Sequence, residues 1–379
     1  MAERRIVSQC MSNRIKVAVI GASYLQLPLV RRAKELGLEV HCFAWEEGAV
    51  CKDVADFFYP ISIVVKDAIL EICRKVGING ICTIASDIAA TTVSYVAERM
   101  GLIANSYEVA VRANNKYLMR NALANAGLPN PSYRAVSSVE EALGIGWKYP
   151  LVVKPSDRSG SLGITGIKAQ EELAPAIEKA ISLSFSRQAM VEEFIEGREV
   201  SVEAISYQGV HYPLQITDKV TTGAPHFVEL EHHQPSTLSK EYFTSLYDLT
   251  HSALDALGIT DGASHSEYRI SDDGSIVIVE IGGRMGGDFI GSDLVRLSTG
   301  YDFLKGVIDV ALGRFKKPEI TKNGHSAVYF LCKETEFLKP VIENLKDNPS
   351  FIEGKILDEE LRNVECSADR SGYVIFYEK

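Results

Sequence analysis

The chain has 379 residues and a formal net charge of −10, and 46% of its residues are hydrophobic and 24% are charged. This length predicts two or three domains, and the composition is typical of a soluble globular protein. The acidic balance argues against a general nucleic-acid-binding protein, which would carry a basic face, but it leaves room for a local basic pocket that binds a phosphorylated ligand.

The cysteines and the apolar segments indicate the compartment. The seven cysteines are odd in number and contain no C-x-x-C pair, so we expect buried free thiols rather than disulfides or a zinc site. No apolar run approaches about 18 residues, and residues 1–14 lack the apolar core of a signal peptide. We therefore expect a cytoplasmic protein with no membrane partner.

Apolar, β-branched runs alternate with segments of helical spacing in the first part of the chain. The runs occupy residues 15–20, 39–44 and 80–84, and the helical segments occupy residues 25–36, 66–76 and 91–100. Because crossovers between parallel strands are right-handed, this order predicts a small doubly wound parallel-sheet domain. Ligands are then expected at the carboxyl ends of its strands.

Two features of this domain bear on its ligand. The loop that begins at Gly21 lacks the later glycines of the dinucleotide fingerprint, and no acidic residue closes the second strand, so nicotinamide binding is not expected. Asp87 follows the third strand, where it faces a ligand or caps the next helix. The sequence slightly favours the helix cap.

Residues 262–288 carry the strongest local signal. Asp273-Gly274 predicts a two-residue hairpin turn, and counting outward from it places Glu267 opposite Glu280, about 5 Å away on the same face of the sheet. Two such carboxylates need a cation, a shared proton or open water. Arg284 follows in a glycine-rich exit, so the segment fits a divalent-metal site with an anion-binding arginine about as well as a solvated hairpin.

Three segments fit the binding of phosphate groups, although each has an ordinary structural alternative. Lys116 lies in the first turn of a helix, where a lysine is better tolerated if it reaches an anion. Lys154 ends an apolar strand and needs a partner if it is buried. The loop at residues 156–164 could cradle phosphate oxygens with its backbone amides, or it is a flexible hairpin tip.

Two more segments fit the rest of a nucleotide site. Strands are predicted at residues 188–195 and 199–207, and the crossover between them exposes backbone groups for an adenine edge, with Glu199 facing ribose; an amphipathic hairpin explains them equally well. Residues 216–236 form a long polar segment with little periodicity, and we expect a functional loop there that carries Lys219. Its adjacent histidines, His232 and His233, point to opposite sides and make a poor metal pair.

The order of these motifs resembles the ATP-grasp superfamily of carboxylate–amine ligases over nearly the whole chain. It is most similar to the bacterial L-amino-acid ligase branch, and formyl-phosphate-forming purine enzymes and biotin carboxylase are more distant. The motifs that carry the resemblance are Asn115-Lys116, residues 152–155, 159–163 and 191–197 with Glu199, and residues 280–288.

The resemblance implies an α/β protein with an α+β ATP-grasp core. Residues 1–108 would form the doubly wound, Rossmann-like domain, and residues 109–313 an ATP-grasp domain whose two α+β subdomains clasp ATP. Residues 314–379 would form a small β-rich subdomain, since strand character resumes at residues 326–331 and 372–377.

The resemblance also implies roles for individual residues. The ATP site would comprise Lys116 and Lys154 on the phosphates, Ser159, Gly160, Ser161 and Gly163 in a closing loop, Glu192, Phe194 and Ile195 at adenine, and Glu199 at ribose. Glu267 and Glu280 would hold Mg²⁺, for which Mn²⁺ could substitute. Arg284 would contact an acyl phosphate, and His265 and Lys219 would lie near the substrates.

One position departs from the family pattern. Gly282 stands where many members have an asparagine two residues after the second metal glutamate, which puts the coordination of a second Mg²⁺ in doubt. The implied function is an ATP-dependent ligase that activates a small carboxylate as an acyl phosphate, joins it to an amine and releases ADP and phosphate. The alternatives are a formate-dependent transformylase or carboxylase acting on a purine precursor, and a non-catalytic nucleotide-binding protein. A homodimer is the default expectation.

Overall fold

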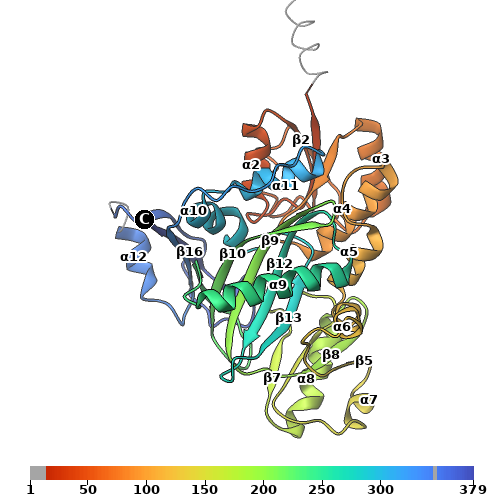
Figure 1. Ribbon diagram of the computed structural model, residues 1–379, viewed down its shortest axis with the longest axis vertical. Helices are drawn as coiled ribbons and strands as arrows, with labels where there is room; N and C mark the ends of the chain where they lie inside the picture. The colour runs from red at the N-terminus through yellow and green to blue at the C-terminus, as the bar shows by residue number, and fades with distance from the viewer. Residues whose placement is uncertain (1–13, 345–347) are drawn as a thin grey trace, which may run out of the picture.

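The computed structural model describes residues 14–344 and 348–379 of the chain. It contains three sheets, with strand orders β3-β2-β1-β4, β5-β8-β6-β7 and β13-β12-β9-β10-β11-β14-β16-β15. Figure 1 shows the first sheet at the top of the view, the eight-stranded sheet through the middle and the small four-stranded sheet at the bottom. The predicted α/β class is confirmed.

The first sheet is parallel throughout, as predicted. Its strands are β1 (Lys16–Ile20), β2 (Glu39–Ala44), β3 (Phe57–Pro60) and β4 (Gly80–Cys82), and its helices are α2 (Leu27–Glu35), α3 (Lys66–Val76) and α4 (Asp87–Met100). Side chains alternate along β1, so Val17 and Val19 pack with α2, whereas Ala18 and Ile20 pack with α3 and α4. Burial of both faces explains why the sequence reads as a continuous apolar run.

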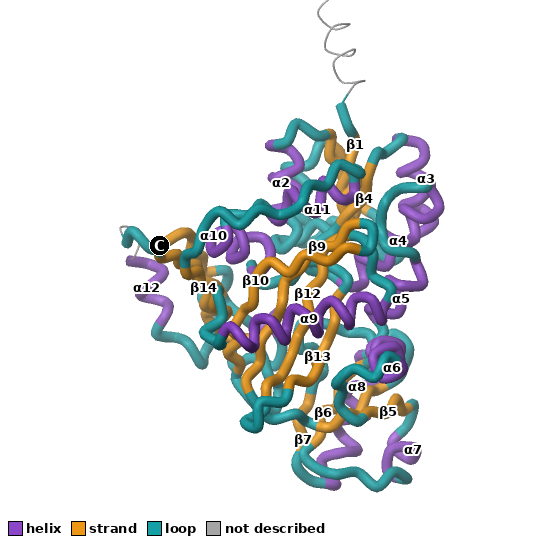
Figure 2. Tube along the Cα trace, viewed as in Figure 1, coloured by secondary structure: helices purple, strands orange, loops and turns teal. Residues whose placement is uncertain are grey.

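The central sheet is antiparallel and extends to the C-terminal end of the described chain. Its strands are β9 (Arg198–Tyr207), β10 (Val210–Thr221), β11 (Glu229–Gln234), β12 (Gly262–Ile270), β13 (Ile276–Gly282), β14 (His325–Leu331), β15 (Phe351–Ile356) and β16 (Gly372–Glu378). Helix α9 (Lys240–Leu257) crosses one face of this sheet (Figure 2). The predicted C-terminal strands form, but β14 pairs with β11, so they continue the central sheet.

Residues 216–236 are mostly strand, so the expectation of one long loop there is wrong. The end of β10 and the whole of β11 form an antiparallel pair in which Lys219 is opposite His232, and only residues 222–228 connect them. The side chains of Lys219, Glu229 and His232 on these two strands line a cavity inside the molecule. The apolar alternation that marks a half-buried strand is therefore missing from the sequence.

The small sheet carries its own core. Its strands are β5 (Tyr133–Val136), β6 (Leu151–Pro155), β7 (Thr165–Ile167) and β8 (Ala189–Glu193), covered by α7 (Val139–Leu143) and α8 (Leu173–Leu183). Before it come α5 (Tyr107–Asn114) and α6 (Lys116–Asn125), and Asn115 caps α6 by accepting a hydrogen bond from the Leu118 amide. This lobe matches one of the two predicted α+β subdomains.

The segment after β13 returns to the first sheet. It contains the π-helix η2 (Ile290–Leu294), α10 (Val295–Thr299) and α11 (Phe303–Ala311), and α12 (Leu338–Asn344) follows later. Val307 and Ile308 of α11 share a core with β1 and α2. The predicted boundaries at residues 108 and 313 stay predictions, and the core of the first domain includes residues from beyond the first of them.

Within the described residues no helix is long and apolar enough to cross a membrane. The cysteines described are free thiols and all but Cys366 are buried, as predicted. Residues 1–13, which hold Cys10 and nearly all of the segment searched for a signal peptide, lie outside the described residues. The expected cytoplasmic location and homodimer stay predictions.

Candidate active site

A cavity of about 690 Å³ lies where the three sheets meet. Its walls include Tyr24 and Ala85 from loops after β1 and β4, Lys154 and Ser161 from the small lobe, Lys219, Glu267 and Glu280 from the central sheet, and Arg370 just before β16. A second pocket of about 100 Å³ adjoins it, and Lys154, Lys219 and Glu280 border both. Loops at the carboxyl ends of the parallel strands reach the cavity, as predicted.

One face of the central sheet forms the floor of the cavity. The register of β9 against β12 places Glu199 beside Arg269, Ser201 beside Glu267, and Glu203 beside His265. Alternate residues of β9 point the other way, and Val200, Val202 and Ala204 lie in the core under α9. The period-two prediction for residues 199–207 is confirmed.

The two predicted metal carboxylates are cross-strand partners, Glu267 opposite Glu280. The placement is right, but the predicted two-residue turn is wrong. Ser271 and Ser275 close a three-residue loop in which Gly274 has a φ of +86°, and a bulge between Glu267 and Tyr268 restores the register. Three-residue loops with glycine in the left-handed region commonly carry such a bulge.

A lysine compensates each of these carboxylates. Lys116 Nζ lies 2.9 Å from Glu280 Oε1, and Lys219 Nζ lies 2.5 Å from Glu267 Oε1, 3.2 Å from Glu199 and 3.5 Å from Glu229. Burial alone would lower the pKa of Lys219, but the three carboxylates raise that pKa well above its usual value. Lys219 is therefore a fixed cation that borders both pockets. Together with Lys116 it offsets the repulsion between the neighbouring carboxylates of Glu267 and Glu280.

Paired carboxylates suit a hard divalent cation, which prefers oxygen ligands and completes its shell with water and phosphate. Over residues 14–344 and 348–379, no group of three or more histidine, cysteine, aspartate or glutamate side chains could hold a metal ion. The candidate metal carboxylates among the described residues are therefore the pair Glu267 and Glu280, and the number of metal ions stays a prediction. A Cβ at Gly282 would lie 3.1 Å from Arg284 Cζ and 3.2 Å from Asp87 Oδ1, so this glycine makes room for an ion pair.

Arg284 forms that ion pair with Asp87 through two hydrogen bonds of 2.9 Å. Asp87 is not the helix cap, because Ser86 accepts the capping hydrogen bond from the Ala89 amide. Burial opposes the charge of Arg284, but Asp87 raises the pKa of the guanidinium above its usual value. The first domain therefore holds the predicted anion-binding arginine in place.

His265 lies between Glu203 and Glu267. Its Nδ1 pairs with Glu203, and its Nε2 lies 3.1 Å from Glu267 Oε1. Although burial alone would lower it, these two carboxylates raise the pKa of His265 to about 9, so the ring is an imidazolium at neutral pH. A Cβ at Gly286 would lie 2.9 Å from Glu203 and from His265, so the glycine-rich exit is needed for close approach.

Lys154 and Glu192 belong to a buried network. Glu192 accepts two hydrogen bonds from Arg120, at 2.9 and 3.0 Å, and lies 2.8 Å from Lys154. Burial raises the pKa of Glu192, but the two cations outweigh it and lower that pKa to about 2. Glu192 lines the smaller pocket, and its oxygens hold Lys154 and Arg120; its contact with adenine stays a prediction.

The smaller pocket contains the predicted adenine and ribose residues Phe194, Ile195 and Glu199. Arg269 donates to Glu199 Oε2 at 2.7 Å and to the Ile195 carbonyl at 3.2 Å. The rings of Phe194 and Phe227 stack with their centroids 5.2 Å apart. These contacts give the pocket a side formed by the two stacked aromatic rings and the Arg269 guanidinium.

The small-residue loop borders the large cavity. Gly160, Ser161 and Gly163 have φ values of +67°, +57° and +75°. A Cβ at Gly163 would lie 2.7 Å from Leu183, so this position requires glycine. Ser159 and Ser161 both line the cavity, and Ser161 Oγ lies 3.4 Å from Glu229 Oε2.

The predicted site residues all line one or both of the pockets except Gly163, which packs against Pro155 and Leu183 beside the large cavity. Four charged side chains that hold the walls of the site in place were not predicted from the sequence: Arg120, Glu203, Arg269 and Arg370. For Glu203 a signal existed, because it shares the polar face of its strand with Glu199. The others show no pattern, because their partners are distant in sequence.

Residues 147–293 match the family model of the ATP-grasp domain. Alanine–anticapsin ligase of Bacillus subtilis (strain 168) is 25% identical over 276 residues, covering 62% of this chain and 57% of that protein. D-alanine–D-alanine ligase of Geobacter sulfurreducens is 29% identical over 202 residues, 50% of this chain and 61% of that protein. The chain thus spans somewhat more than half the length of these curated relatives.

Solved structures show the same fold over almost the whole chain. L-amino acid ligase from Bacillus licheniformis superposes with a TM-score of 0.79 at 22% identity, covering 96% of this chain and 93% of that one. Phosphoribosylglycinamide synthetase from Anaerococcus prevotii gives a TM-score of 0.75 at 20% identity, covering 97% and 94%. The match of residues 147–293 to the ATP-grasp domain model bears out the predicted ATP-grasp relation, and the solved structures confirm the predicted fold class.

Proposed function

We propose that this chain, which carries an ATP-grasp domain, is an ATP- and Mg²⁺-dependent ligase that joins a small carboxylate to an amine. The observation that carries the proposal is the pair Glu267 and Glu280, flanked by Lys116, Lys154 and Lys219, at the junction of the two pockets. A site of this charge pattern suits a metal-bound triphosphate.

ATP would lie across both pockets. Its adenine would enter the smaller pocket beside the stacked rings of Phe194 and Phe227, with ribose near Glu199, and its phosphates would extend toward Lys116 and Lys154. Glu267 and Glu280 would hold Mg²⁺, with Mn²⁺ as a substitute; the metal, when bound, neutralises charge on the phosphates.

The chain's own residues would support two steps. In the first, the γ-phosphoryl group moves from ATP to the carboxylate, and Lys116 and Lys154 offset the crowding of anions. In the second, the amine attacks the acyl carbon, phosphate leaves, and Arg284 stabilises the oxyanion and the departing phosphate. The loop with Ser159 and Ser161 would exclude water from the acyl phosphate.

The alternatives receive less support from the geometry. A transformylase or carboxylase for a phosphorylated purine precursor needs a phosphate pocket in the first domain, and there Arg32 is already paired with Asp302 and Glu35. A non-catalytic nucleotide-binding protein has no need for Lys116, Glu280 and Arg284 to converge on one cavity.

Phosphate release from Mg·ATP tests the proposal. Release should require both a carboxylate and an amine from a panel of amino acids and small acids, and it should stop when Mg²⁺ is omitted. Release with formate or bicarbonate alone would favour the alternative enzymes.

Glu280→Gln removes one metal carboxylate and leaves Lys116 without its ion-pair partner, so we expect turnover to fall at least a hundredfold. Glu71→Gln changes an exposed glutamate of α3 and should leave turnover unchanged. Full turnover by Glu280→Gln would disprove the metal assignment, and absence of release by the wild type with every pair would count against the ligase itself.

A further inference from the structure

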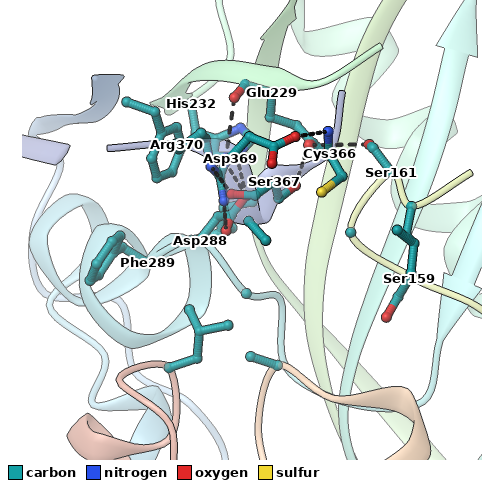
Figure 3. A pocket seen from close by; sticks show the side chains of 18 of the residues that line it. Ser159, Ser161, Glu229, His232, Asp288, Phe289, Cys366, Ser367, Asp369 and Arg370 are labelled. Carbon is teal, nitrogen blue, oxygen red and sulfur yellow. Dashed lines mark hydrogen bonds and ion pairs between the residues drawn. The ribbon is translucent and has the colours of Figure 1, made fainter. Parts of the chain in front are cut away.

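A second group of charged side chains lines the large cavity on the wall formed by the C-terminal strands. Figure 3 shows Asp288, Arg370 and His232 of this group together. Arg370 Nη1 donates to Asp288 Oδ2 at 2.8 Å, and Arg370 Nη2 donates to Asp288 Oδ1 at 2.6 Å. The function proposed above uses none of the three.

The environment of Arg370 leaves it little freedom. Its Nε donates to the Ser367 carbonyl at 2.9 Å, and its guanidinium lies 3.7 Å from the centre of the Phe330 ring. Burial opposes its charge, but Asp288 raises the pKa of the guanidinium above its usual value. Arg370 is therefore a buried, rigid cation whose two terminal nitrogens hold the Asp288 carboxylate.

Asp288 is held in an uncommon backbone conformation. Its φ is +52°, and that of the next residue, Phe289, is +63°. Residues other than glycine occupy this region rarely, and such strain persists only where the surroundings impose it. Here the Phe289 ring lies 4.2 Å from that of Tyr373, between centroids, and the ion pair with Arg370 fixes the side chain.

His232 adds an unmet hydrogen-bonding group to the same wall. Its side chain is fully buried, and neither ring nitrogen has a hydrogen-bond partner. Its Nε2 lies 3.7 Å from Asp288 Oδ2, too far for a good hydrogen bond, and both residues line the cavity. Burial lowers the pKa of His232, so the ring is neutral at neutral pH and one nitrogen is a free acceptor.

We propose that Asp288 and His232 bind the amine substrate as a primary ammonium ion, and that Arg370 is the positioning residue that holds Asp288 toward it. Before the nitrogen attacks the acyl carbon, the ammonium ion would lose one proton to the neutral His232 ring, which leaves the amine with a free lone pair. Arg370 uses one lone pair of each Asp288 oxygen, which leaves the others for a ligand in the cavity. An ionised carboxylate and a neutral imidazole nitrogen both accept hydrogen bonds, so the ligand that fits donates several and carries positive charge.

The other charges near this wall support the same ligand. Glu229 lies on it and is only partly compensated by Lys219, at 3.5 Å. Asp369 is occupied with the backbone amides of Glu365 and Cys366. An ammonium group bound at Asp288 would thus lie near the Glu229 carboxylate. The neighbouring cations Arg370 and Lys219 are each held by a carboxylate, Arg370 by Asp288 and Lys219 by Glu199, Glu229 and Glu267.

This inference rests on the proposed ligase activity, and an acceptor without charge separates the two. Hydroxylamine is uncharged at neutral pH and traps an acyl phosphate as a hydroxamate, whereas glycine and L-alanine arrive as ammonium ions. The wild type should form a hydroxamate with at least one acid of a panel of L-amino acids, and an amide with glycine or L-alanine as acceptor.

Asp288→Asn should lower kcat/KM for the ammonium acceptor tenfold to a hundredfold and change hydroxamate formation less than about twofold. Because this variant leaves Arg370 buried without a charged partner, the double variant Asp288→Asn with Arg370→Gln repeats the test with both charges removed. Asp358→Asn is the control. Asp358 also borders the cavity, but its oxygens are engaged by the Glu360 amide and Arg362.

Equal losses with glycine and with hydroxylamine would overturn the inference, and so would unchanged use of glycine. Wild-type enzyme that forms no hydroxamate would instead overturn the ligase activity. Saturation-transfer NMR with L-alaninamide decides the inference in that case. The saturation-transfer signal of L-alaninamide should appear with the wild type and with Asp358→Asn, and it should vanish with Asp288→Asn. Absence of this signal with the wild type would refute the ammonium site.

Discussion

At the scale of single residues, the site is built from buried charges that are each compensated by a partner. The pairs are Lys116 with Glu280, Lys219 with Glu267, Arg284 with Asp87, Arg370 with Asp288, and Arg120 with Glu192. An unpaired buried charge would cost several kcal/mol, so the pairs allow the fold to hold these charges ready for a highly charged substrate. When a charged ligand binds, a lysine such as Lys116 can exchange its carboxylate partner for a ligand oxygen, so the protein's own charges stay compensated.

Glu192 gives this compensation a measurable pH dependence. Its pKa is about 2 in the folded protein, where burial is outweighed by Arg120 and Lys154, against 4.5 when unperturbed. A lowered folded-state pKa means that the stabilisation is fully present above pH 4.5 and is lost as the pH falls toward 2. Over this window Glu192 should contribute about 1.4 kcal/mol per pH unit to the free energy of unfolding.

Urea titrations at pH 5, 4 and 3 measure that slope. Glu192→Gln should be less stable than the wild type by about 3–5 kcal/mol at pH 5, because it leaves two buried cations with one partner fewer. The difference should shrink as the pH falls. Glu71→Gln should follow the wild type at each pH, and a constant difference between wild type and Glu192→Gln would rule out titration of this group.

Sequence predicted which residues gather at the site better than it predicted what each one touches. Lys116, Lys154, Glu267 and Glu280 come from local motifs, and local spacing sufficed to find them. The partner of Arg284, in contrast, is Asp87, which lies 197 residues away. Nothing within either segment specifies that pair, because it forms only when the first domain docks on the central sheet.

At the scale of elements, the small-residue loop is attached to the C-terminal segment. The Ser367 amide donates to the Gly160 carbonyl at 3.2 Å, and Ser367 Oγ lies 3.2 Å from Glu229 Oε2, which Ser161 also reaches. The loop that would close over phosphates is therefore held by a turn preceding β16. The loop was predictable from its glycines, and its attachment was not, because it joins two irregular segments.

Ser367→Pro tests this attachment with little other change. Ser367 begins a 3-10 helix, and Cys366 before it is extended, with φ −151° and ψ 169°, so a proline is compatible with the backbone there. The substitution removes the amide donor together with the hydroxyl, and Ser367→Ala removes the hydroxyl alone. We expect faster hydrogen exchange in residues 157–164, a higher KM for ATP and little change in global stability. Ser367→Ala keeps the amide and should show slow exchange. Unchanged exchange in Ser367→Pro would show that the loop is fixed by other contacts.

At the scale of the whole molecule, the first domain and the central sheet share a core. Val307 and Ile308 of α11 pack in the same cluster as Val17 and Leu29, although α11 follows the ATP-grasp strands in the chain. A Cβ at Gly80 in β4 would lie 2.8 Å from the Ala311 carbonyl, so the helix also approaches the strand closely. Which sheet α11 covers depends on tertiary packing, and local spacing within the helix does not specify it.

Because of this shared core, a change in α11 should loosen the first sheet. Ile308→Ala truncates a fully buried side chain and should cost about 2–5 kcal/mol, with faster hydrogen exchange in β1 as well as in α11. Ile320→Ala makes the same truncation at a side chain that is 55% exposed and should change either quantity little. Since Asp87 holds Arg284 from this domain, Ile308→Ala should also reduce turnover near its lowered melting temperature. Faster exchange confined to α11, with β1 protected as in the wild type, would mean that the first domain folds without the helix and that the ion pair alone connects it to the site.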